Sequence, residues 1–138
     1  MSAHDPALTA LAQNWLALSV LHGRIEGRIE RALQANHNLS AREYWLLDVL
    51  GRQHDGVGGH LQMKQVADAI VLSQSATTRL VTRLEDRGRL TRDVSEEGLA
   101  LLEAARPTND TALREALDDA STEPDLVPLV DAIRRAES

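Results

Sequence analysis

The chain has 138 residues, a formal net charge of −6 and no cysteine, which excludes disulfides, cysteine-ligated zinc and thiol redox sensing. Hydrophobic residues make up 43% and charged residues 26%, a balance typical of a globular domain rather than a disordered chain. Phenylalanine is absent and aromatic residues amount to only 2%, so the core must be built from leucine, valine, isoleucine and alanine. Such a core favours helices, and we expect a single all-α domain over 1–138, with or without an oligomerisation element.

Charge and hydropathy also limit location and partners. No apolar run approaches the roughly 18 residues of a membrane span, and "MSAHDPAL" lacks the features of a signal peptide, so we expect a cytoplasmic protein without a membrane partner. The net negative charge argues against a general nucleic-acid coat. Positive charge is nevertheless concentrated: 64–92 carry six basic and three acidic residues, whereas 93–138 carry four basic and twelve acidic.

The first predicted element is a long amphipathic helix over 5–36. Its apolar stripe recurs every three or four residues and consists of Leu8, Leu11, Trp15, Leu18, His22, Ile25, Ile29 and Leu33. A stripe of this length needs more partner surface than a small domain offers, and a second subunit could supply it. Asn36–Asn38 is predicted to break the helix.

The second predicted helix starts at Ser40, which forms a capping box with Glu43 and precedes a segment that ends near Gln53. The glycine-rich stretch 54–60 is predicted to be a turn. A short helix over 61–70 follows, then a three-residue turn with Ser73 as N-cap, and then a helix over about 74–87 that stops at Gly88. Two further helices are predicted over about 95–117 and 125–136.

The segment 61–87 therefore has the spacing of a helix-turn-helix, in which the second helix enters the DNA major groove. The inward side of 74–87 is predicted to be Thr77, Leu80, Val81 and Leu84. Its outward side offers an amide, small hydroxyls and two arginines, the side chains that contact base edges and phosphates, and no acid occurs between Asp68 and Glu85. An ordinary solvated helix is the alternative, but such faces usually carry Glu/Lys pairs. The outward set is Gln74, Ser75, Thr78, Arg79, Thr82 and Arg83.

The stretch "LQMKQVADAIVLSQSATTRLVTRLEDRGRLTR" resembles the winged helix-turn-helix of MarR-type transcriptional regulators. Their recognition helix has the pattern S-x-S-x-x-T-R-L-V-x-R-L-E-x-R-G, which this chain matches from Ser73 to Gly88. "LSAREYWLLDVL" and "VSEEGLALLEAARP" extend the resemblance over nearly the whole chain. It implies a winged helix-turn-helix with a small β-wing, a DNA-binding lobe over 40–94, and dimerisation helices over 5–36 and 107–136.

The resemblance also implies a function. We expect a sequence-specific DNA-binding transcription regulator, a ligand-responsive repressor, that binds a pseudo-palindromic operator in double-stranded DNA as a homodimer and associates with the nucleoid when bound. A protein–protein adaptor with a winged helix and no DNA binding is the alternative, and a gel shift would separate the two. The candidate DNA contacts are Lys64, Ser73, Gln74, Ser75, Thr77, Thr78, Arg79, Thr82, Arg83, Arg87 and Arg92.

The sequence departs from the family pattern after Arg92, where about ten wing residues are missing before Asp93. A hairpin needs two strands and a turn, so either the protein lacks a wing or a hairpin is left out at this point. The intact residues on both sides favour the second explanation. It predicts that the Cα atoms of Arg92 and Asp93 lie farther apart than the 3.8 Å of a trans peptide.

Other side chains suggest a small-molecule pocket but no catalysis. Trp15, His22, Tyr44 and Trp45 supply most of the aromatic surface and are candidates for an effector site, since members of the family bind phenolic carboxylates; His22 could equally be a core or interface histidine. His54 and His60 lack a third metal ligand, so we expect neither a metal nor a cofactor. "GVGG" has no accompanying strand or Lys-Ser/Thr, and no nucleophile with a base is evident, so we expect no enzyme.

Overall fold

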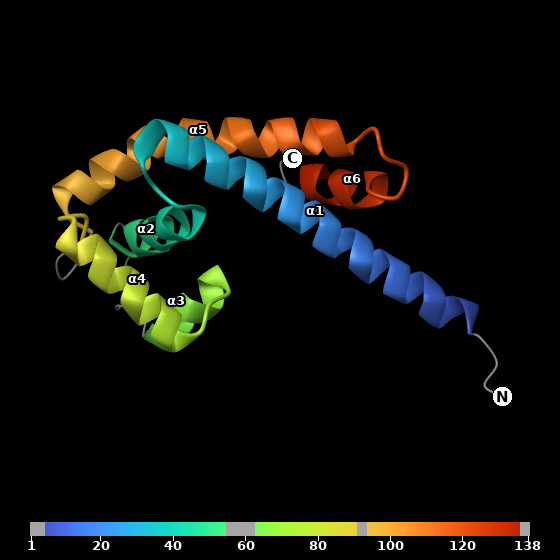
Figure 1. Ribbon diagram of the computed structural model, residues 1–138, viewed down its shortest axis with the longest axis horizontal. Coiled ribbons are helices and arrows are strands. Elements are labelled where there is room, and N and C mark those ends of the chain that lie inside the picture. Colours follow the sequence, from blue (N-terminus) through green and yellow to red (C-terminus); the bar gives the residue numbers. More distant parts are fainter. Residues whose placement is uncertain (1–4, 55–62, 91–93, 136–138) are drawn as a thin grey trace. The chain divides into compact units, whose positions relative to one another are not determined.

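The computed structural model describes residues 5–54, 63–90 and 94–135, and the helices found there are shown in Figure 1. Each lies within three residues of its predicted bounds, and the predicted, mainly helical fold with a helix-turn-helix is confirmed. In chain order they are α1 (Pro6–His37), α2 (Ala41–His54), α3 (Met63–Ile70), α4 (Gln74–Asp86), α5 (Glu96–Ala120) and α6 (Val127–Arg135).

The chain divides into two compact units. The first consists of Met1–Arg31 and Asp110–Ser138, and therefore holds the N-terminal part of α1, the C-terminal part of α5, and α6. The second is Ala32–Asn109, which contains α2, α3 and α4. Both chain ends thus belong to one unit and the helix-turn-helix to the other.

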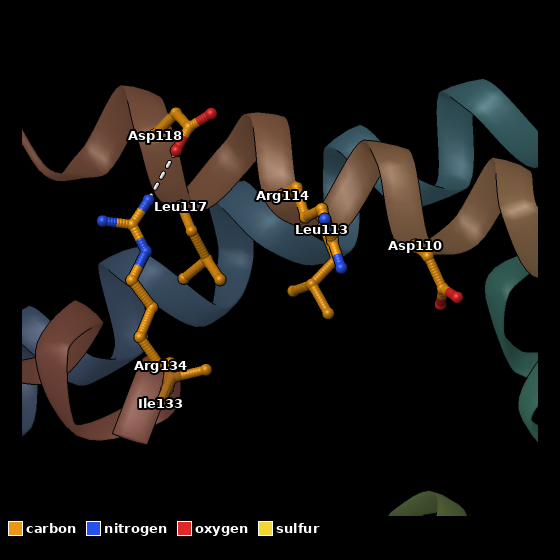
Figure 2. Close-up of a pocket in the computed structure, with 7 residues that line it drawn as sticks. All are labelled: Asp110, Leu113, Arg114, Leu117, Asp118, Ile133 and Arg134. Carbon is orange, nitrogen blue, oxygen red and sulfur yellow. Dashed lines mark hydrogen bonds and ion pairs between the residues drawn. The ribbon is translucent and has the colours of Figure 1, made fainter. Parts of the chain in front are cut away.

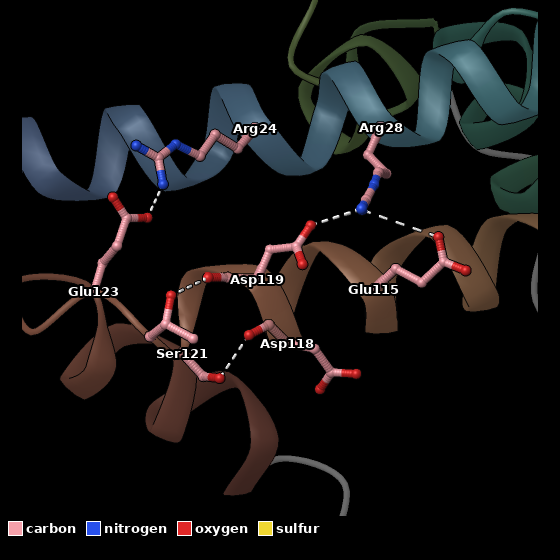
Figure 3. A network of polar contacts seen from close by, with 8 residues as sticks. Arg24, Arg28, Glu115, Asp118, Asp119, Ser121 and Glu123 are labelled. Atoms are coloured by element: carbon pink, nitrogen blue, oxygen red, sulfur yellow. Dashed lines mark hydrogen bonds and ion pairs between the residues drawn. The ribbon is translucent and has the colours of Figure 1, made fainter.

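The first unit has a small core between α1, α5 and α6. Buried leucine, alanine and valine side chains fill it, and Arg24 and Arg28 of α1 form ion pairs around its edge (Figure 3). Arg24 pairs with Glu123, and Arg28 pairs with Asp119 at 2.6 Å. These pairs are partly exposed, so burial of the apolar cluster contributes most of the stabilisation. The buried residues are Leu21, Leu117, Ala120, Leu126 and Val130.

The predicted stripe on α1 is only partly the buried face. Ile29 and Leu33 are buried, but Leu11 and Trp15 are exposed in the single chain, by 64% and 70%. Leu21, which lies outside the predicted stripe, faces the core instead. Leu8, Leu11 and Trp15 precede Ala17, the first residue of α1 that packs against this core in the described part of the chain.

The second unit begins with the predicted capping box. Glu43 N donates to Ser40 Oγ at 3.0 Å, and Ser40 N donates to Glu43 Oε1 at 2.9 Å. The other carboxylate oxygen of Glu43 accepts from Arg87 at 3.1 Å, and Arg87 also donates to the Asn38 carbonyl at 2.8 Å. A single buried carboxylate therefore ties the start of α2 to the end of α4.

The connection between α3 and α4 is a tight turn. The Leu72 amide donates to the Ala67 carbonyl at 2.9 Å and closes α3, with Val71 in a left-handed conformation at φ 58°. Ser73 is the N-cap of α4, as predicted, since its Oγ accepts from the Ala76 amide at 3.2 Å. One hydrogen bond therefore ends α3 and another starts α4, and their donors, the Leu72 and Ala76 amides, are close together in sequence.

At the base of the expected wing, Leu90 and Val94 form an isolated antiparallel β-bridge. Ser95 strengthens this junction by donating from its backbone amide to the Arg89 carbonyl at 3.1 Å and from its hydroxyl to the Gly88 carbonyl at 2.7 Å. The predicted separation of Arg92 and Asp93 lies outside the described residues.

Candidate nucleic-acid interface

The helix α4 has a buried side and an exposed side, as its sequence predicts. Thr77, Leu80 and Leu84 are buried at 2% exposure or less, and Val81 is half-buried. Packing of this stripe holds α4 in place within its unit, so the side chains on the opposite side of the helix point away from the core. The exposed side carries the full predicted set, which is Gln74, Ser75, Thr78, Arg79, Thr82 and Arg83.

The basic residues of this region fall into two groups. Arg87 is held by Glu43 and Asn38, and Arg89 lies 3.5 Å from a carboxylate oxygen of Glu97. Arg79 and Arg83 are exposed and take part in no ion pair within the part of the chain that the structure describes. Two guanidinium groups one turn apart on α4 are therefore available to an external anion or base.

The start of α4 adds backbone donors to this surface. The first N–H groups of any helix lack an intrahelical acceptor and carry a partial positive charge, which suits a phosphate. Here Ser73 Oγ caps one of them and lies 3.3 Å from Ser75 Oγ, so two hydroxyls stand beside the remaining amides. The helix start thus combines neutral donors with the arginines farther along.

Some sequence candidates are placed elsewhere. Thr77 has no exposed surface and donates its hydroxyl to the Ser73 carbonyl at 2.9 Å, which argues against a DNA contact and corrects its inclusion among the candidates. Arg87 has the internal partners described above, which sequence reasoning missed because Glu43 lies 44 positions away. Arg92 and the side chain of Lys64 lie outside the described residues.

Comparisons with known proteins agree with this geometry. Residues 37–98 match the model of the MarR family. A MarR family transcriptional regulator from Silicibacter pomeroyi has a similar structure, with 24% identity, 96% coverage of each chain and a TM-score of 0.76. Another from Rhodococcus sp. RHA1 is 28% identical, over 98% of this chain and 95% of that one, with a TM-score of 0.70. The chain therefore resembles the MarR family and shares the winged helix-turn-helix fold of its solved members.

A third similar structure is a MarR family protein of Mycobacterium tuberculosis in complex with DNA, with 19% identity, 88% coverage of this chain, 94% of that one and a TM-score of 0.65. A search of curated proteins finds no match. Members of the MarR family are transcription regulators and not enzymes, which agrees with the prediction that this chain has no catalytic function.

The four effector candidates are divided between the two units, two in each. In the first unit, Trp15 and His22 are both exposed, and His22 Nδ1 lies 3.5 Å from a Glu26 oxygen. In the second unit, Tyr44 is buried at 4% exposure, and Trp45 packs under Arg42, whose guanidinium lies 5.6 Å from the ring centroid. Tyr44 thus contributes to the core of the second unit.

One more cation lies close to Tyr44. Arg106 forms ion pairs with Asp48 and Glu103, each at 3.5 Å. Burial alone lowers the pKa of Arg106, but Tyr44 and the two carboxylates outweigh it and raise the pKa above the ordinary value. The guanidinium therefore stays charged and is committed to its acidic neighbours.

A hollow in the first unit lies between α5 and α6 (Figure 2). It has a volume of about 570 Å³, a floor of Leu113, Leu117 and Ile133, and a rim where Arg134 pairs with Asp118 at 2.5 Å. A second hollow of about 650 Å³ lies between α1 and the connection from α5 to α6, where Leu16 and Val20 contribute apolar surface. Both hollows are lined in part by apolar side chains that are exposed in the single chain. These are Ile133 in the first hollow, and Leu16 and Val20 in the second.

Neither a membrane segment nor a metal cluster is found in the ranges that the structure covers. None of the helices there combines the length and the apolar character needed to cross a bilayer. No group of three or more histidine, aspartate or glutamate side chains in those ranges could hold a metal ion. His60 and the side chain of His54 lie outside the described part of the chain.

Proposed function

We propose that this protein is a sequence-specific DNA-binding transcription regulator that acts as a homodimer. In this proposal, α4 of each subunit enters a major groove of a pseudo-palindromic operator, with half-sites about one helical turn apart. The protein represses its target genes in the cytoplasm until an effector releases it.

The observation that carries the proposal is the exposed polar face of α4 and its two arginines. Arg79 and Arg83 are exposed without an ion pair in the described structure, in a chain whose net charge is −6. Guanidinium groups form two hydrogen bonds to guanine O6 and N7, and a glutamine such as Gln74 can do the same with adenine. A helix with this face and a fixed inner stripe meets the steric requirement for direct readout.

The dimer has separate support in the first unit. The N-terminal half of α1 exposes large apolar side chains that would be unfavourable in water, and the hollows beside α6 could receive apolar side chains from a partner. A two-fold dimer through this unit would place two copies of α4 on one DNA molecule. The exposed residues are Leu8, Leu11, Trp15, Leu16, Leu18 and Val20.

For the effector we propose a small aromatic or phenolic acid. The candidate residues remain Trp15, His22, Tyr44 and Trp45. The exposed Trp15 and His22 support this proposal more strongly than the buried Tyr44 does.

A protein–protein adaptor without DNA binding is the alternative function. One observation favours it: only three residues separate the bridged Leu90 and Val94, which leaves little chain for a wing that reaches the minor groove. The free arginines on α4 weigh against it, because an adaptor surface does not require them.

The test measures binding of the full chain to duplex DNA from the region upstream of its own gene, by gel shift and fluorescence anisotropy. Arg79→Ala is expected to weaken binding by about 1–3 kcal/mol and to relax base preference at one position of each half-site. Arg52→Ala serves as the matched control, since it removes an exposed arginine at the end of α2. Equal behaviour of the two variants would contradict the role of α4, and absence of wild-type binding would favour the adaptor.

A further inference from the structure

The hydroxyl groups of two exposed threonines on α4 are already used inside the helix. Thr78 Oγ1 donates to the Gln74 carbonyl at 2.9 Å, and Thr82 Oγ1 donates to the Thr78 carbonyl at 3.0 Å. A hydroxyl has a single proton to donate, so neither threonine has a donor left for a base or a phosphate. What each side chain still offers is its methyl group and a lone pair on oxygen.

The position of each methyl group follows from the same bonds. Threonine is branched at Cβ and occupies staggered rotamers, so an Oγ1 atom held against the helix backbone leaves the methyl in a defined position. Thr78 and Thr82 are both exposed and four residues apart, which places them on one face of α4, opposite the buried Leu80 and Leu84. The two methyl groups therefore form a short, pre-organised apolar row on a surface that is otherwise polar.

Thymine is the base that matches such a row. Its C5-methyl group projects into the major groove, where it is the apolar feature among the base edges, and it makes apolar contacts with threonine methyls. Each threonine is followed directly by an arginine, Arg79 or Arg83, whose chemistry suits guanine. Two residue types with different base preferences thus alternate along the same exposed helix.

We infer that Thr78 and Thr82 contribute to operator specificity through their methyl groups, by contacting thymine C5-methyl groups in each half-site. This inference rests on the proposed DNA-binding function and adds the chemical group that is recognised. It differs from hydroxyl-mediated recognition, in which threonine would donate to a phosphate or a base.

The experiment starts from duplexes that the full-length wild-type protein selects from a random pool. In the selected duplex, each thymine is replaced in turn by deoxyuridine, which removes only the C5-methyl group. Affinities are compared for the wild type, for Thr78→Ser and Thr82→Ser, which keep the hydroxyl, and for Thr78→Val and Thr82→Val, which keep the methyl. Circular dichroism melting verifies that each variant is folded.

At the contacted positions, deoxyuridine is expected to weaken wild-type binding by roughly threefold to fivefold, the effect of losing one buried methyl contact. Because the homodimer carries the substitution in both half-sites, the serine variants should weaken binding to the thymine duplex by about the square of that factor, and they should not respond to deoxyuridine at that position. The valine variants should retain both the affinity and the response.

The opposite pattern, in which valine weakens binding and serine does not, would show that the hydroxyl oxygen accepts a hydrogen bond from a base and would overturn the inference. So would wild-type affinities that no deoxyuridine substitution changes. Failure of the wild type to select any duplex would overturn the DNA-binding function itself, so the two failures are distinguishable.

Discussion

Val71 is the residue whose backbone is least suited to its side chain. Its φ of 58° lies in the left-handed region, which β-branched residues rarely adopt because Cβ crowds the following carbonyl oxygen. It occupies the position after α3 where glycine is usual, and the Leu72 amide bonds back to the Ala67 carbonyl around it. Its side chain is 80% exposed, so burial does not offset the strain.

We therefore predict that Val71→Gly increases the free energy of unfolding by about 0.5–1 kcal/mol. Relief of roughly 1–2 kcal/mol of left-handed strain exceeds the roughly 0.4–1 kcal/mol that glycine adds to the entropy of the unfolded chain. Urea denaturation followed by circular dichroism measures the change. Val71→Ala is the control, since its Cβ retains most of the strain, and a lower midpoint for the glycine variant than for the wild type would contradict the prediction.

The two ends of this turn differ in how far the sequence could predict them. Ser73 was predictable as an N-cap, because a capping hydroxyl acts within three residues of itself. The conformation of Val71 was not, since its own propensity disfavours it and the packing of both helices imposes it. The direction of the Thr78 hydroxyl was likewise open in sequence, where a base, a phosphate and the Gln74 carbonyl are all suitable acceptors.

At the scale of the secondary structure elements, Gly98 of α5 leaves the least room for a side chain among the glycines of the described residues. Gly98 lies in its first turn, where a Cβ atom would come within 2.2 Å of the Arg89 carbonyl oxygen and 2.8 Å of Val94 Cγ1. Because the first of these is a backbone atom, it cannot move away without disturbing the Ser95–Arg89 hydrogen bond. Because Gly98 has no side chain, the first turn of α5 can pack directly against Arg89 and Val94 beside the β-bridge.

Gly98→Ala is expected to decrease the free energy of unfolding by at least about 1–3 kcal/mol, the usual result of forcing extra volume into a packed site. Gly23→Ala provides a control of opposite sign. Nothing lies within 4 Å of the Cβ position at Gly23, which is in the middle of α1, so alanine should stabilise the helix by about 0.5–1 kcal/mol. Thermal unfolding of both variants measures this, and a stable Gly98→Ala protein would contradict the close approach.

Element bounds were predictable here, whereas packing partners were not. The capping box at Ser40 and the break at Asn38, where φ is 51°, are local signals, and the helices begin and end close to them. The pairing of Glu43 with Arg87 joins residues far apart in sequence, so a charge pattern could not distinguish it from a DNA contact by Arg87. The sequence also did not determine which side of α1 is buried within the chain, because Leu21 and the predicted stripe both follow helical spacing.

At the scale of the whole molecule, α1 carries both a buried apolar surface and an exposed one. Leu21 packs in the core of the first unit, but the six exposed side chains from Leu8 to Val20 need a cover that the described chain does not provide. A second copy offers the same apolar helix and the hollow between α5 and α6. Because a two-fold contact uses the same surface on both partners, one substitution changes it twice.

We predict that the wild-type protein has twice the 15.1 kDa chain mass in light scattering at micromolar concentration, with an interface of roughly 2,000 Å² or more. Leu11→Glu should shift the mass toward 15.1 kDa, because it introduces two charges into the apolar contact. Ala100→Glu is the matched control: it adds the same charge at an exposed position of α5 in the second unit and should leave the dimer intact. A wild-type monomer, or a dimer that tolerates Leu11→Glu, would show that this stripe is not the interface. In the second case the two α4 helices would have to be paired through another surface.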